Sequence, residues 1–185
     1  MQEGRDHHPE RFEALNATLS QWLPEFSAVS FDVEQPGRRL IFLRTREGGY
    51  EIPAANLSQG TLLALAMLTL AYLPNPPPVI GLEEPDRGIH PRLLRHFQDA
   101  LYRLCYPEKC GEKRQPVQVI ATTHSPYFLD LFRDHPEEIV IANRLEQNVQ
   151  FERLSDRKDI HEILGDAPLG EVWYSGILGG VPSEP

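Results

Sequence analysis

A short, uninterrupted apolar run that ends in two adjacent carboxylates constrains this chain more than any other part of its sequence. The run is Val79-Ile80-Gly81-Leu82, and Glu83-Glu84-Pro85 follows it directly. Continuous apolar runs of this length are typical of parallel strands that are covered on both faces. Ligands bind beyond the carboxyl ends of such strands in open α/β sheets. The segment therefore predicts a buried strand whose carboxyl end is a candidate site.

Strand and helix patterns alternate in the sequence that follows this run. Pro91 can open the first helix, and the apolar spacing predicts, in order, a helix over 91–104, strands over 117–122 and 139–142 separated by a short helix over 125–132, an edge strand over 149–154 and helices near 156–164 and 169–178. Strands that alternate with helices predict right-handed crossovers and a parallel sheet. We therefore expect an α/β fold.

The sequence before the apolar run predicts a helix, a hairpin and a second helix. A helix can start at Pro9 and end at Pro24. Residues 27–34 and 38–46 alternate apolar with polar side chains around a Gln35-Pro36-Gly37 turn, which predicts an antiparallel hairpin. A strongly apolar helix is expected from Ser58 to Tyr72, capped by Ser58 or by Asn56. We expect an N-terminal helix and tail over 1–26 and one larger domain over 27–185.

Composition excludes several classes of protein. Apolar residues make up 41% and charged residues 24% of the 185 residues, which is typical of a globular domain. The net charge of −9 argues against strong, sequence-independent binding of nucleic acid by electrostatic attraction. The net charge does not exclude a local basic patch. Two cysteines and no apolar N-terminal signal segment predict a cytoplasmic protein. The longest apolar stretch, Leu62–Leu73, is too short to span a bilayer.

The carboxylate pair at the end of the predicted strand suits metal-assisted chemistry. Consecutive strand residues point to opposite sides, so Glu83 and Glu84 can divide two roles. One carboxylate can reach a hydrated Mg²⁺, and the other can orient or deprotonate a water molecule. An ordinary acidic junction between a strand and a loop has the same residues, and this alternative stays open.

Two further segments contain groups that can bind a phosphate. His124 follows the predicted strand over 117–122 and could hydrogen-bond a γ-phosphate beside the carboxylates, although a histidine in a capped turn is the alternative. Ser58 and Gly60 stand at the start of the apolar helix, where free backbone amides can bind an anion. Serine-rich helix starts are common, so this segment is informative only together with the others.

Taken together and in this order, the segments resemble the C-terminal half of an ABC-type ATPase head. The resemblance is to the SMC/RecF-like branch and its AAA-family relatives, and it covers about residues 30–180 by the order of elements. Leu57–Thr61 resembles the ABC signature, and Glu83-Glu84-Pro85 resembles a Walker B segment with its catalytic glutamate. Asp86–Pro91 resembles the D-loop, and His124 in Thr-His-Ser-Pro resembles the H-loop histidine.

The resemblance implies a fold, two cofactors and a partner. The fold would be the parallel-sheet C-terminal lobe of a P-loop NTPase, with an N-terminal antiparallel hairpin. In such heads two copies enclose two ATP molecules, each held by the P-loop of one copy and the signature of the other. The implied cofactors are ATP and Mg²⁺, and the implied partner is a P-loop lobe or a second ATPase head.

The resemblance also implies a role for each matching residue. Ser58, Gln59 and Gly60 would contact the nucleotide of the opposite copy. Glu84 would be the general base, with Glu83 holding Mg²⁺ through water. The implied roles of the two remaining residues are γ-phosphate sensing for His124 and communication across the dimer for Asp86.

The sequence departs from the family pattern at two places. Glu83 stands where most members have aspartate, and an outer contact to Mg²⁺ can absorb the extra methylene. The sequence G-x-x-x-x-G-K-[ST] is absent from the 185 residues, and none of the three lysines, Lys109, Lys113 and Lys158, follows a glycine-rich loop. We therefore expect half of a head, which is inactive in ATP hydrolysis until a P-loop lobe completes it.

Two other functions remain as alternatives. The first is a degenerate, non-hydrolysing half-head that docks on a partner through its exposed sheet edge and the apolar helix, where Leu62, Leu63 and Met67 would include partner-facing positions. The second is a metal-dependent nuclease whose metal ligands are Glu83, Glu84, Asp86 and His90. Nucleic acid is a possible partner that the net charge does not support.

Overall fold

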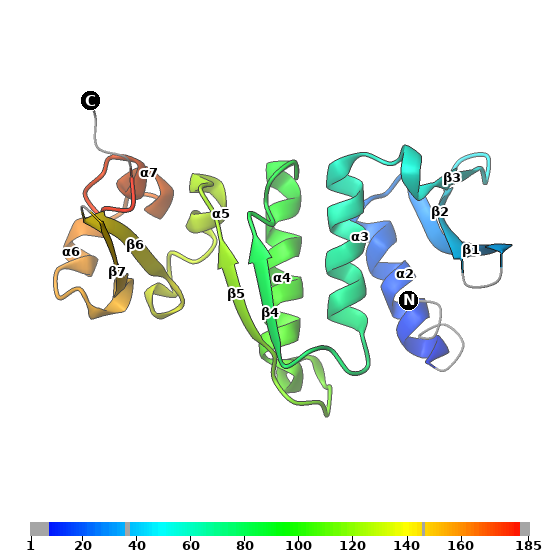
Figure 1. The fold of residues 1–185 in the computed structure, drawn as a ribbon, viewed down its shortest axis with the longest axis horizontal. Helices are drawn as coiled ribbons and strands as arrows, with labels where there is room; N and C mark the ends of the chain where they lie inside the picture. The colour runs from blue at the N-terminus through cyan, green and yellow to red at the C-terminus, as the bar shows by residue number, and fades with distance from the viewer. Residues whose placement is uncertain (1–7, 36–37, 146, 182–185) are drawn as a thin grey trace. The chain divides into compact units, whose positions relative to one another are not determined.

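The computed structural model describes residues 8–35, 38–145 and 147–181. The chain divides into two compact units, residues 1–122 and residues 123–185, and each is described by itself. Figure 1 gives the helix and strand labels that are used below. Pro36 and Gly37 of the predicted hairpin turn lie outside the described residues.

The first unit opens with helix α2 (Pro9–Trp22), as the sequence predicts. Proline is tolerated in the first turn of a helix because that turn has no intrahelical acceptor for its amides. Leu15, Leu19 and Trp22 form the buried face of α2. This face packs against β1 and α3, so the N-terminal helix is part of the core of the first unit.

An antiparallel sheet of three strands follows, in the order β1 (Phe26–Gln35), β2 (Arg38–Thr45) and β3 (Glu51–Pro53). Val29 and Leu43 are paired across β1 and β2, and both are buried. The predicted hairpin is therefore confirmed. The sequence pattern did not reveal β3, because three residues are too few to show a period of two.

Helix α3 (Gln59–Tyr72) begins where the sequence places its cap. The Ser58 hydroxyl accepts a hydrogen bond from the Thr61 amide at 3.1 Å. The helix packs against α2 and α4 in the core. Leu62 is 40% exposed, but Met67 is only 3% exposed. The expectation that Met67 faces a partner is therefore wrong, because this side chain fills the core of the unit.

Strands β4 (Val79–Glu83) and β5 (Gln118–Thr122) form a parallel pair, which confirms the predicted α/β arrangement. Between them lie the short 3₁₀ helix η2 (Pro91–Leu93), α4 (Leu94–Cys105) and the 3₁₀ helix η3 (Pro107–Cys110). Figure 1 shows the two arrowheads pointing the same way with α4 alongside. Ile80 and Val117 are buried on one face of the pair, together with Leu104 of α4.

The other face of the parallel pair is exposed. Val79 is 53% exposed and Ile120 is 58% exposed. The sequence predicted a strand covered on both faces, and this expectation is wrong for the described residues, since α4 covers only one face. An apolar run alone does not show whether the element that packs on the second face of the strand belongs to the same chain.

The second unit contains an antiparallel pair and several short helices. Its elements are α5 (Pro126–Asp130), η4 (Pro136–Glu138), β6 (Val140–Leu145), β7 (Asn148–Arg153), η5 (Leu154–Asp156), α6 (Ile160–Leu164) and α7 (Leu169–Tyr174). Strand β6 pairs with β7 in antiparallel orientation, in a sheet of two strands. The sequence predicted a parallel strand here, and the observed pairing is antiparallel, because the short connection between β6 and β7 favours the local hairpin.

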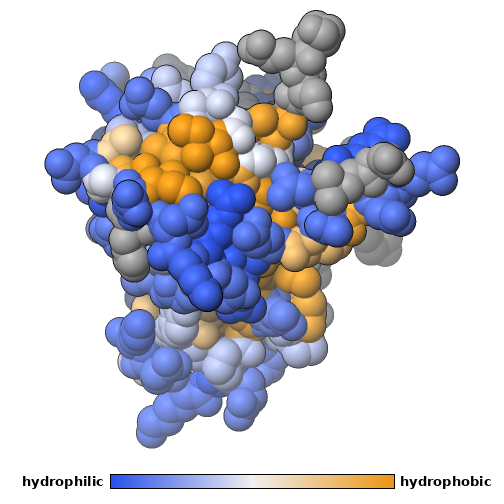
Figure 2. All heavy atoms as spheres, turned by 90° about the vertical axis from the view of Figure 1, so that its left-hand side faces the viewer, coloured by the Kyte–Doolittle hydropathy of each residue, from blue (hydrophilic) through white to orange (hydrophobic). Residues whose placement is uncertain are grey.

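The core of the second unit is small and includes the fully buried Leu154 and Leu178. A Cβ at Gly170 of α7 would collide with the carbonyl of Pro126, so α5 and α7 pack closely there. Apolar side chains also remain exposed on this unit, including Phe151 at 74% and Ile177 at 60%. Figure 2 shows an apolar patch beside a strongly hydrophilic area. Among the described residues, no helix combines the length and the apolar character needed to cross a membrane.

Candidate functional site

The carboxyl end of β4 holds both candidate carboxylates. Glu83 is the last residue of β4, is exposed and is paired in register with Thr122 of β5. The Glu84 amide donates to the Thr122 carbonyl at 3.0 Å and to its hydroxyl at 3.3 Å. These bonds join the ends of the two parallel strands, so both carboxylates stand on a fixed part of the backbone.

Glu84 has a strained backbone. Its φ is +43°, and it is the only residue other than glycine with positive φ among those the structure describes. The left-handed region costs a residue with a Cβ about 1–2 kcal/mol. Such strain persists where the surrounding structure enforces it, and it is concentrated at functional sites. The alternation of faces expected for Glu83 and Glu84 ends at Glu83, because Glu84 has left the strand conformation.

A tight turn follows Glu84 and contains the predicted Asp86. The Arg87 amide donates to the Glu84 carbonyl at 2.9 Å, and the Ile89 amide donates to the Asp86 carbonyl at 3.1 Å. The Arg87 guanidinium lies 3.4 Å from Glu84 Oε2. The Glu84 side chain is 33% exposed, so its carboxylate remains open to solvent.

The start of α3 packs against this turn. A Cβ at Gly60 would lie 2.5 Å from the Gly88 carbonyl oxygen, a distance that real Cβ atoms do not adopt. A Cβ at Gly88 would lie 3.5 Å from the Gln59 side chain. The structure therefore brings the predicted residues Gln59 and Gly60 together with the loop that contains Asp86. Ser58 caps α3, and its hydroxyl also lies 2.8 Å from the Thr61 hydroxyl.

His124 belongs to the second unit and is placed only within that unit. It is exposed and follows the last residue of β5 by two positions. The next residue, Ser125, caps α5, and its hydroxyl accepts from the Phe128 amide at 3.3 Å. His124 therefore stands in a turn just before a short helix, as the sequence predicts.

The chemistry available at the end of β4 is that of exposed carboxylates beside a capped helix start. Carboxylate oxygens are the ligands that Mg²⁺ prefers in proteins. The start of α3 presents backbone amides and the positive end of a helix dipole, which favour an anion. The arrangement suits a Mg²⁺-bound phosphate better than a soft metal, for which sulfur ligands would be expected.

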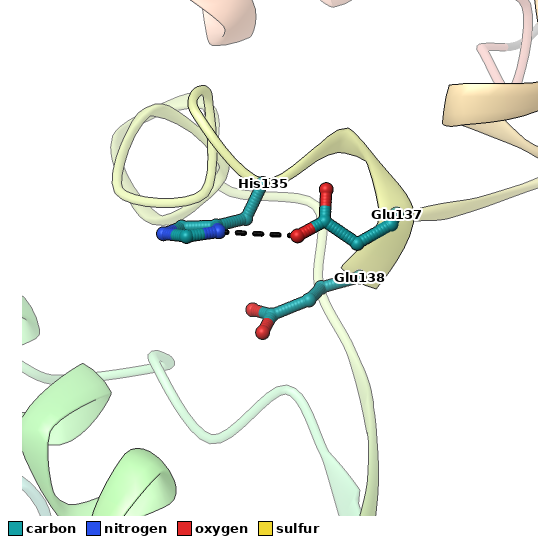
Figure 3. Close-up of side chains that lie close together, drawn as sticks. All are labelled: His135, Glu137 and Glu138. Carbon is teal, nitrogen blue, oxygen red and sulfur yellow. Dashed lines mark hydrogen bonds and ion pairs between the residues drawn. The ribbon is translucent and has the colours of Figure 1, made fainter.

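Sequence reasoning did not find a second group of metal-ligand types in the second unit. Figure 3 shows His135, Glu137 and Glu138, whose ligand atoms all lie within 4.8 Å of one another. His135 Nδ1 is 3.2 Å from Glu137 Oε1. The Glu137 backbone amide, and secondly the His135 side chain, lower the pKa of the Glu137 carboxyl by hydrogen bonding. The sequence His-Pro-Glu-Glu over 135–138 could have indicated this group. All three side chains are exposed, and exposed acidic groups are common in proteins without a bound metal ion.

Comparisons with known proteins identify the family. The family model described as "AAA domain, putative AbiEii toxin, Type IV TA system" matches residues 2–130. No curated protein matches the chain. One similar solved structure comes from work titled "Structural biochemistry of ATP-driven dimerization and DNA stimulated activation of SMC ATPases". It has a TM-score of 0.47 and 17% identity over 88% of this chain and 96% of that chain. Since the family model spans more than half of the sequence, the chain belongs to this family of AAA-type ATPase domains.

Proposed function

We propose that this chain is the signature and Walker B lobe of an ABC-type ATPase of the SMC/RecF-like branch. Residues 27–185 form the lobe in this proposal, and residues 1–26 are an N-terminal helix and tail. The observation that carries the proposal is the strained Glu84 at the carboxyl end of β4. A glutamate held there, next to a turn that contacts the start of α3, is what a water-activating carboxylate beside a phosphate site requires.

In this proposal the two carboxylates of the β4 end have different tasks. Glu84 accepts a proton, at a carboxylate oxygen, from the water that attacks the γ-phosphorus, while the bond from that phosphorus to the β–γ bridging oxygen breaks and ADP and phosphate leave. Glu83, which is exposed at the strand end, would hold Mg²⁺ through a water molecule. Mg²⁺ held there would supply positive charge to offset the developing negative charge on the phosphates.

The residues at the start of α3 bind the nucleotide of the opposite copy. Ser58, Gln59 and the backbone at Gly60 face the phosphates of an ATP whose other contacts come from a P-loop.

His124 and Asp86 have two further roles in this proposal. His124 donates a hydrogen bond to the γ-phosphate, and Asp86 transmits the state of one site to the other across the dimer. Close packing of Gly60 on Gly88 supports this coupling, because movement at the signature would move the turn with Asp86.

A separate P-loop lobe completes the enzyme in this proposal. Parallel strands are normally covered on both faces, yet Val79 and Ile120 are more than half exposed on the open face of β4 and β5. The 185 residues contain no G-x-x-x-x-G-K-[ST] sequence. Both observations support a complementing lobe that brings the P-loop and covers this face. The chain alone is then inactive in ATP hydrolysis.

Substitution of Glu84 tests this function. The P-loop lobe is sought in the coding sequence upstream of Met1 and in the neighbouring frame, and it is co-expressed with the chain. Glu84→Gln keeps the shape of the side chain but removes the base, so we expect Mg²⁺-dependent phosphate release to fall by at least about a hundredfold. Glu47→Gln, an exposed glutamate away from the site, is the matched control and should retain the rate. Full activity of Glu84→Gln would exclude Glu84 as the base.

The second candidate function is a docking module that does not hydrolyse ATP. The exposed apolar face of β4 and β5 favours it as well, because a partner could cover that face without chemistry. The two functions differ in their response to Glu84→Gln. A docking module should bind its partner and act with or without this carboxylate.

A further inference from the structure

A cavity lies at the amino ends of β4 and β5, at the opposite end of the parallel pair from Glu84. It has a volume of about 580 Å³ and is lined by the start of α2, by Pro74–Pro76 before β4 and by residues 113–115 before β5. All of these residues belong to the first unit. Strands of this length separate the cavity from the β4 carboxylates by roughly 16 Å, so it is not part of the proposed ATP site.

Two of the cations that line this cavity, Arg11 and Arg114, belong to a charge cluster with Arg103 and Glu112, which are not lining residues themselves. Glu112 is only 7% exposed and forms ion pairs with three guanidinium groups, those of Arg11, Arg103 and Arg114. Arg114 Nε lies 2.7 Å and an Arg11 nitrogen 3.5 Å from Glu112 Oε2. One carboxylate balances one of the three cations. The cluster therefore has two positive charges in excess, and this excess favours a further anion at this place.

The two arginines that line the cavity are held in position. The guanidinium of Arg114 donates to the Leu104 carbonyl at 3.1 Å and to the Arg103 carbonyl at 2.6 Å. Arg11 donates to the Leu73 carbonyl at 3.3 Å. A ligand that meets these charges does not have to order them first, which lowers the cost of binding.

Lys113 and His8 also line the cavity. Lys113 is exposed, and among the described residues it forms neither a hydrogen bond nor an ion pair. The Nδ1 of His8 lies 3.7 Å from a carboxylate oxygen of Glu10. Among the described residues that line the cavity, Arg11, Lys113 and Arg114 are cationic and none is a carboxylate. This excess is local, since the chain as a whole carries a net charge of −9.

We propose that this cavity binds the phosphate groups of a ligand that carries at least two negative charges. Guanidinium and ammonium groups are the usual phosphate partners in proteins. The unbalanced charge of the wall matches a diphosphate or a stretch of nucleic-acid backbone better than a single carboxylate. The volume lies in the range of small-molecule sites. The site is additional to the nucleotide site at the carboxyl end of β4.

Calorimetric titration of the full chain with inorganic pyrophosphate tests the proposal. The titration is done at low ionic strength and without Mg²⁺, so that the carboxylates at β4 offer no metal-bridged binding. We expect one saturable site. Lys113→Glu should weaken it about tenfold, because it reverses a charge that lines the cavity without removing a contact of the fold. Lys158→Glu changes the net charge equally in the second unit and should bind like the wild type.

Two further measurements separate the possible sources of phosphate and the two sites. Displacement of pyrophosphate by a single-stranded oligonucleotide identifies nucleic-acid backbone as the ligand, and absence of displacement identifies a small phosphorylated molecule. Ser58→Ala and Glu84→Gln should leave pyrophosphate binding unchanged, whether or not the proposed ATPase function holds. The proposal is overturned if the wild type shows no saturable binding, if Lys113→Glu and Lys158→Glu weaken it equally, or if Glu84→Gln abolishes it.

Discussion

Glu84 combines a strained backbone with the side chain that the proposed chemistry needs. A positive φ at a residue with a Cβ is unfavourable, and glycine would adopt the same conformation without that cost. The hydrogen bonds from its amide to Thr122 hold the residue there. If stability alone determined this position, glycine would be the better residue. The presence of glutamate therefore supports a functional reason for its carboxylate.

Comparison of Glu84→Gly with Glu84→Ala measures this strain. Both variants lose the carboxylate and its contact with Arg87, but only glycine relieves the left-handed backbone. We expect the free energy of unfolding of Glu84→Gly to exceed that of Glu84→Ala by about 1 kcal/mol. Urea denaturation of the two variants checks this difference. Equal stability would mean that the backbone at this position is not strained.

The carboxyl of Glu51 on β3 has a pKa that depends on two neighbouring side chains. Hydrogen bonds from the side chains of Ser30 and then Arg44 lower the pKa of Glu51 below its ordinary value. A lowered pKa in the folded state stabilises the fold above the unfolded pKa, and this contribution is lost as the pH falls through the folded value. Ser30→Ala should raise the pKa of Glu51, as followed by NMR titration. Ser27→Ala, whose hydroxyl bonds a backbone carbonyl, should leave it unchanged.

The contact between helix α3 and the turn after β4 depends on a glycine. Alanine normally favours a helix over glycine by up to about 1 kcal/mol. At Gly60 the added Cβ meets the Gly88 carbonyl at 2.5 Å, so we expect Gly60→Ala to destabilise the chain by about 1–3 kcal/mol. Gly81→Ala is the matched control, since nothing lies within 4 Å of its Cβ position. Urea unfolding that finds Gly60→Ala as stable as Gly81→Ala would disprove the close packing.

Most elements of the first unit were predictable because each has a strong period of its own. Helix α2, the hairpin of β1 and β2, helix α3 and the parallel strands β4 and β5 lie where the apolar spacing and the capping residues indicated. Strand β3 is too short for such a signal. Strand β6 was predicted as a parallel strand, and its antiparallel pairing with β7 was missed, because the order of elements does not show that a short connection favours a local hairpin.

The candidate site was predictable in its residues but not in its geometry. Residue types and their order indicated Ser58, Glu83, Glu84 and His124 as candidates, and the family match supports the resemblance that connected them. The positive φ of Glu84 and the packing of Gly60 depend on contacts between distant segments. Such contacts arise from packing in three dimensions and leave no local pattern in the sequence.

Strands β4 and β5 have an apolar face that the described residues of the first unit leave exposed. A substitution on this face tests whether a partner covers it. Ile120→Glu should change the stability of the chain by less than about 0.5 kcal/mol, because the side chain is 58% exposed. The same change should prevent co-purification with the P-loop lobe, since a charge would enter the covered face. Val140→Glu, at a 52% exposed position of the second unit, is the control. Normal co-purification of Ile120→Glu would mean that the lobe binds elsewhere.

Reconstitution of ATP hydrolysis from two separate polypeptides tests the central claim most directly. Phosphate release is measured with a fixed amount of the P-loop lobe while this chain is added in increasing amounts. We expect no hydrolysis from either component alone and a rate that rises and saturates as the complex forms. A P-loop lobe that hydrolyses ATP equally well without this chain would contradict the account.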